Sequence, residues 1–136
     1  MYIRNFQDLN VWQKSHQVVL EIYKVTKHYP AEEKFGLITQ IRRSSISVSA
    51  NIAEGFKKST KDFIRYIEIA QGSLEETKYH LILSRDLEYL MLSDFTKIYN
   101  LSDDISKMLF SLNKKLELRL TSTINHSSQS TVHSSL

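Results

Sequence analysis

The chain has 136 residues, of which 41% are hydrophobic and 24% are charged, a balance typical of one globular domain that buries a core. Its formal net charge of +3 is mildly basic, which permits binding to phosphate backbones without requiring it. Cysteine is absent and only 3 glycines and 1 proline occur, which excludes disulfides, thiolate metal sites, cysteine nucleophiles and a sandwich of many short strands.

The sequence contains no stretch that approaches the roughly 18 consecutive apolar residues of a membrane span. Residues 1–10 also lack the apolar run of a signal peptide. We therefore expect a cytoplasmic protein that does not contact a membrane.

Four amphipathic segments follow one another, and in each of them apolar side chains recur at the three- and four-residue spacing of a helix. The predicted helices span about residues 9–28, 31–55, 60–87 and 93–120. Asp8 and Ser93 are the expected N-caps of the first and fourth helices, and residues 59–62 have capping-box spacing. Pro30 ends the first helix, and Gly55 is the residue type favoured just past a helix C-terminus. Long helices with short connections predict an all-α fold, an antiparallel up-down-up-down four-helix bundle over residues 1–120.

The composition changes at Thr121, after which serine and threonine dominate and charged residues are absent. Such a segment cannot bury enough apolar surface to offset its chain entropy. We predict that residues 121–136 form a disordered Ser/Thr-rich tail.

Small polar side chains form a stripe on the second predicted helix, opposite its apolar face, and a comparable stripe on the third. The stripe residues are Gln40, Arg43, Ser47, Asn51 and Glu54, followed by Tyr66, Ser73 and Glu76. Because short hydrogen-bonding side chains let another helix come close, we predict that these residues form an oligomer interface. Arg43 has two interpretations: it pairs with Glu54 or Glu76, within or between subunits, or it binds phosphate.

Basic residues surround the turn between the second and third helices, where Asp62 is the nearby opposing charge. The predicted nucleic-acid-binding residues are Arg42, Lys57, Lys58, Lys61 and Arg65. In an antiparallel bundle the cluster of Lys114, Lys115 and Arg119 lies at the same end, so that both clusters build one basic rim. The alternative is that lysines near helix C-termini offset the helix dipole and keep the surface soluble.

No sequence pattern predicts catalysis. Di-metal bundles use a Glu-x-x-His spacing, whereas His80 follows Glu76 by four residues and Glu75 by five. A glycine-rich phosphate loop and a Ser-His-Asp order are also missing. We expect no catalytic residue, no metal and no cofactor.

Three motifs carry a resemblance to a known family, namely Glu33-x-Phe35-Gly36-Leu37, Gln40-Ile41-Arg42-Arg43-Ser44 and Asn51-Ile52-Ala53-Glu54-Gly55. With these motifs the chain resembles, over roughly residues 6–117, the four-helix-bundle proteins encoded in 23S rRNA intervening sequences. Those proteins are similar in turn to the accessory variability protein of diversity-generating retroelements. Relatives often carry glycine at the position of Glu88.

The resemblance implies a ring-like homopentamer without enzyme activity. For the retroelement relatives it implies a positively charged surface that binds nucleic acid and a reverse transcriptase. The resulting hypothesis is a non-enzymatic oligomer that binds structured RNA or DNA through its backbone, alone or as an accessory to a nucleic-acid enzyme. Two alternatives are a protein-interaction scaffold with no nucleic-acid role and a metal-dependent enzyme built in a bundle.

Overall fold

The computed structural model describes residues 3–125 of the chain, which contain four α-helices, two short 3-10 helices and no strand. The elements are η1 (Phe6–Asp8), α1 (Asn10–Thr26), η2 (Ala31–Glu33), α2 (Leu37–Phe56), α3 (Thr60–Asp86) and α4 (Leu92–Asn125). None of the helices in this part of the chain is long and apolar enough to cross a membrane.

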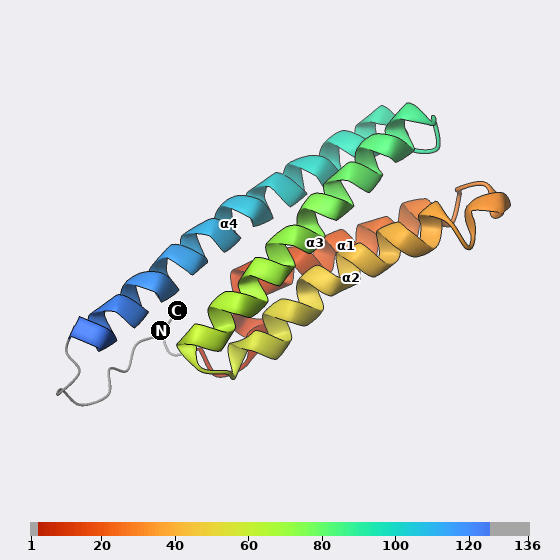
Figure 1. The fold of residues 1–136 in the computed structure, drawn as a ribbon. Helices are drawn as coiled ribbons and strands as arrows, with labels where there is room; N and C mark the ends of the chain where they lie inside the picture. The colour runs from red at the N-terminus through yellow and green to blue at the C-terminus, as the bar shows by residue number, and fades with distance from the viewer. Residues whose placement is uncertain (1–2, 126–136) are drawn as a thin grey trace.

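Contacts between successive helices fix their directions. The hydroxyls of Ser15 and Ser49 lie 2.8 Å apart, and Arg42 Nε donates to Thr26 Oγ1 at 2.9 Å, so α1 and α2 run antiparallel. Helices α2 and α3 are also antiparallel, because Ser47 contacts Ser73 and Ser44 contacts Thr77. Helices α3 and α4 are antiparallel too, because Lys78 contacts Asp103 and Arg85 contacts Phe95. The predicted up-down-up-down bundle is confirmed, with the α2–α3 turn and the C-terminus of α4 at one end (Figure 1).

The core lies along the middle of the bundle, where all four helices turn their apolar faces inward. Its largest fully buried apolar side chains are Ile22, Ile41, Ile52, Ile67, Leu74, Leu81, Ile98, Ile105, Leu109 and Leu116. Burying one isoleucine or leucine of this kind contributes roughly 1.5–3 kcal/mol, so this row holds the helices together.

The helix ends follow the sequence in part. Ser59 caps α3 as predicted, because its hydroxyl accepts a hydrogen bond from the backbone N–H of Asp62 at 3.2 Å. The N-cap prediction for Asp8 is wrong, since Asp8 closes η1 and Leu9 precedes α1. The prediction for Ser93 is also wrong, because α4 already begins at Leu92.

The second helix begins later than its sequence pattern predicts. Residues 31–33 form η2, and α2 starts only at Leu37. The Glu33 carboxylate accepts a hydrogen bond from the backbone N–H of Leu37 at 3.1 Å, so it satisfies a donor that the first turn of α2 leaves free.

Gly55 is not the residue past the end of α2 that its type suggests. It lies buried within the helix, which continues to Phe56. A Cβ atom on Gly55 would lie 2.6 Å from Tyr66 Cβ and 2.9 Å from Phe63 Cδ1. The glycine is therefore required by the close approach of α2 and α3, not by a turn.

The predicted tail begins too early. Helix α4 continues through Asn125, and the hydroxyl of Thr121 donates to the carbonyl of Glu117 at 3.0 Å. Extending an existing helix adds one hydrogen bond for each residue ordered, so polar residues continue a helix that they would not start. The remainder of the predicted tail, residues 126–136, lies outside the described part of the chain.

Helix α3 ends in a Schellman motif whose left-handed residue is Glu88, with φ of 62°. The N–H of Glu88 donates to the carbonyl of Arg85 and the N–H of Tyr89 to that of Ser84, both at 2.9 Å. This conformation is strained for a residue with a Cβ atom and free of strain for glycine.

We expect Glu88→Gly to raise the free energy of unfolding by about 1 kcal/mol, because it removes the left-handed strain. Chemical denaturation measures the effect, with Glu88→Ala as the matched control that keeps the Cβ atom. An alanine variant as stable as the glycine variant would contradict this explanation.

Candidate functional site

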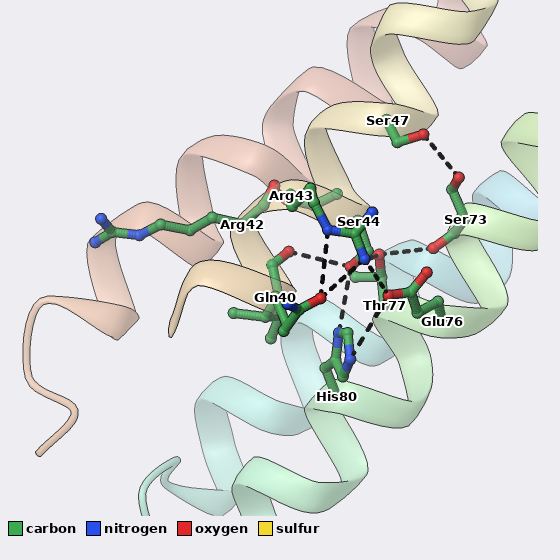
Figure 2. A network of polar contacts seen from close by, with 11 residues as sticks. Gln40, Arg42, Arg43, Ser44, Ser47, Ser73, Glu76, Thr77 and His80 are labelled. Carbon is green, nitrogen blue, oxygen red and sulfur yellow. Dashed lines mark hydrogen bonds and ion pairs between the residues drawn. The ribbon is translucent and has the colours of Figure 1, made fainter. Parts of the chain in front are cut away.

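A network of polar contacts joins α2 to α3, and we call its members the polar seam. They are Gln40, Arg43, Ser44, Ser47, Ser73, Glu76, Thr77 and His80, and Figure 2 shows them between the two helices. Arg43 Nη2 lies 2.9 Å from Glu76 Oε2 and donates to Gln40 Oε1 at 2.8 Å. The hydroxyls of Ser47 and Ser73 lie 2.8 Å apart.

The inner layer of the polar seam is buried. The hydroxyls of Thr77 and Ser44, two fully buried residues, lie 2.8 Å apart, and His80 Nδ1 lies 3.3 Å from the same Ser44 oxygen. On its other side His80 Nε2 lies 3.8 Å from Glu76 Oε2. The seam therefore connects an exposed ion pair to buried hydroxyls through one imidazole.

Most of the predicted interface residues meet within one chain. Arg43 pairs with Glu76 rather than with Glu54, and Asn51 Nδ2 donates to the carbonyl of Ser47 at 2.8 Å. Tyr66 packs against Gly55, and Glu54 is exposed at the end of the stripe. The small polar side chains thus let α3 of the same chain approach α2.

Burial holds the pKa of His80 below its ordinary value, because it disfavours the charged imidazole; Glu76 opposes this effect, and the nearby Arg43 guanidinium adds to it. Ser44 faces the ring from α2 as an uncharged partner. The neutral imidazole is therefore the form that fits the polar seam.

We expect acid to weaken the fold through His80. Because its folded pKa is depressed, the stability it contributes is complete above about pH 6.5 and is lost as the pH falls toward the folded pKa. Denaturant unfolding between pH 8 and pH 5 measures this loss, whose slope for one proton is at most about 1.4 kcal/mol per pH unit. His80→Gln should reduce the slope relative to the original chain; an unchanged slope in this variant would contradict the assignment.

A second group of residues, the basic turn, consists of Lys57, Lys58, Lys61 and Arg65 and surrounds the connection between α2 and α3. All of them are exposed, and within the described residues none forms a salt bridge. Lys57 Nζ lies 5.7 Å from the centroid of the Phe56 ring, a contact that leaves its charge unneutralised. The turn lies at the same end of the bundle as the C-terminal part of α4 (Figure 1).

Arg42 does not join the basic turn. Its guanidinium lies 4.2 Å from the centroid of the Tyr23 ring, and its Nε donates to the hydroxyl of Thr26. Arg42 therefore links α2 to α1, and it lies about four helical turns away from Lys57 along α2. The structure separates it from the other predicted nucleic-acid-binding residues.

A surface hollow of about 310 Å³ opens beside the basic turn, and we call it the turn hollow. Its lining residues are Lys58, Asp62, Arg65, Tyr66 and Ile69. Sequence reasoning did not include Asp62 and Ile69 in a site, although the spacing 62, 65, 66 and 69 places these residues on one helix face. Another hollow, of about 380 Å³, lies between α4 and the start of α1 and has Lys107 and Lys115 in its lining.

Metal ligands do not gather in this structure. Over residues 3–125 no group of three or more histidine, aspartate or glutamate side chains is placed to hold an ion. Glu76 and His80 approach each other, and the Glu76 oxygen that faces His80, Oε2, is also the one that pairs with Arg43 Nη2 at 2.9 Å.

Fold and surface together define a small all-helical bundle with an exposed basic turn at one end. The family model of the 23S rRNA-intervening sequence protein matches residues 7–111, and the chain belongs to that family, as its motifs predict. It is similar to a protein with unknown function from the S23 ribosomal protein family of Bacteroides thetaiotaomicron VPI-5482, whose crystal structure is solved at 1.70 Å resolution. The chains are 36% identical with a TM-score of 0.71, and the match covers 76% of this chain and 98% of the other. No curated protein matches.

Proposed function

We propose that this protein is a non-enzymatic oligomer that binds nucleic acid through its basic turn. The observation that carries the proposal is the set of Lys57, Lys58, Lys61 and Arg65, whose charges have no carboxylate partner among the described residues. Unpaired cations at one end of a rigid bundle attract the phosphate backbone without reading its sequence.

The oligomer in this proposal uses the outward side of α2 and α3, next to the polar seam. Ile46 and Tyr79 are 42% and 58% exposed there, and Ala50 and Gly72 are small and also exposed on these two helices. A Cβ atom on Gly72 would have nothing within 4 Å, so the second copy has room to approach. The family resemblance favours a homopentamer, in which a repeated basic turn strengthens binding through multivalency.

The partner enzyme in this proposal is one that acts on nucleic acid, such as a reverse transcriptase. The resemblance to retroelement accessory proteins supports that choice. A protein-interaction scaffold without a nucleic-acid role would use the same α2–α3 side, and its partner would be retained after nuclease treatment.

A titration across salt tests the proposal. We expect a labelled RNA hairpin to bind, and four phosphate contacts give a slope of log K against log salt of about −3. Light scattering on the same sample at micromolar concentration should give a mass several times that of one chain. The absence of salt-sensitive binding at low ionic strength would overturn the nucleic-acid role, and a monomer would overturn the oligomer.

A further inference from the structure

We propose that the turn hollow holds one unpaired nucleotide, so that single-stranded segments are the preferred ligand of this protein. This inference rests on the proposed function, which requires only contact with phosphates. It adds a binding site for one nucleobase, and it therefore predicts a preference for single-stranded over double-stranded nucleic acid.

The walls of the turn hollow are of two kinds. Lys58 and Arg65 are exposed cations without a salt bridge in the described chain, so they can hold the phosphate. Tyr66 is half-buried and Ile69 is 52% exposed, so they offer an aromatic and an apolar surface to a base. Double-stranded nucleic acid would use only the cations, because its bases are already stacked on each other.

Asp62 gives the second argument for a nucleotide rather than a bare phosphate. Its carboxylate repels an anion, yet it lines the same hollow as Lys58 and Arg65. A nucleotide presents hydrogen-bond donors that a phosphate lacks, namely the exocyclic amines of bases and the sugar hydroxyl of RNA. A nucleotide whose phosphate contacts Lys58 and Arg65 and whose amine or hydroxyl donates to Asp62 would match all the charges of the hollow.

The volume and the rigidity of the hollow agree with this ligand. About 310 Å³ lies at the small end of the range for sites that bind small molecules, which suits one nucleotide and not a helix. The Tyr66 side chain is held where it leaves the backbone, because its Cβ and Cγ atoms pack against the Cα side of Gly55. A ring held in this way is a stacking surface that loses little entropy when a base binds.

The test compares single-stranded RNA with a blunt-ended RNA duplex that has the same number of phosphates, by fluorescence anisotropy at one salt concentration. We expect the single strand to bind about tenfold more tightly, since stacking of one base on an aromatic ring has about this effect. Tyr66→Leu, which keeps the packing against Gly55, should remove that advantage and leave duplex binding and its salt slope unchanged. Phe110→Leu is the matched control, because Phe110 is an exposed aromatic residue beside Lys114 on α4.

A second readout does not depend on affinity. A single strand containing 4-thiouridine should crosslink on irradiation to a peptide that contains Tyr66 or Ile69. Equal affinity for both RNAs, or full single-strand affinity in Tyr66→Leu, would overturn the inference while the proposed function stands. Failure of both RNAs to bind would overturn the two together.

Discussion

Gly55→Ala is expected to lower the free energy of unfolding by about 2 kcal/mol. The added Cβ atom would lie 2.6 Å from Tyr66 Cβ, which is attached directly to the backbone of α3, so α3 must move away from α2. Overpacking of this kind costs up to about 3 kcal/mol, and the better helix propensity of alanine offsets about 1 kcal/mol of it.

Gly72→Ala is the matched control for this change, because it is the same substitution on α3 in open space. With nothing within 4 Å of the new atom, we expect it to raise the stability of the single bundle by up to about 1 kcal/mol. Denaturant unfolding of both variants measures the contrast. A Gly55→Ala variant as stable as the original chain would show that the helices adjust without strain.

The same substitution links packing to the proposed site. Gly55 packs against the Cβ and Cγ atoms of Tyr66, and Tyr66 lines the turn hollow. A shift of α3 should therefore change nucleic-acid binding at temperatures where Gly55→Ala remains folded.

The periodicity of apolar residues was sufficient to predict the helices, because each helix buries one face and the spacing of that face is local information. The cap at Ser59 was predictable for the same reason, since a side chain and a backbone donor three residues apart determine it. The helix starts predicted from Asp8 and Ser93 were wrong by one or two residues, because Asp8 belongs to η1 and α4 already begins at Leu92.

The candidate site depends on contacts between helices, and these are less visible in a sequence. The small polar stripe of α2 correctly indicates that a helix comes close, but it does not say which helix, and α3 of the same chain occupies much of it. Gly55 shows the same limit. A glycine at this position is compatible both with a helix end and with a close approach of two helices, and only the short distance to Tyr66 in the structure identifies the second role. The run of basic residues in the sequence was sufficient to predict the basic turn. Ile69 was identified as part of the site only from the structure, where it lines the turn hollow.

Replacing Lys57, Lys58 and Lys61 together with glutamate is expected to weaken RNA binding by about 100-fold at 150 mM salt. Three lost phosphate contacts remove roughly 2–3 units from the salt slope, and at this concentration that change corresponds to about two decades in affinity. The fold should persist, because all three side chains are exposed and none has a salt bridge within the described residues. Circular dichroism checks the fold and anisotropy across salt measures the binding.

Net charge alone would also weaken binding, so the control must change it equally. Lys24, Lys27 and Lys34 are exposed and lie at the other end of the bundle, around the α1–α2 connection (Figure 1). Their replacement with glutamate gives the same net charge, and we expect only a modest loss of affinity with a nearly unchanged slope, because screening limits exposed charges to about 8–10 Å. Equal losses in both triple variants would mean that RNA responds to the overall charge of the protein, and unchanged affinity in the first would exclude the basic turn from binding.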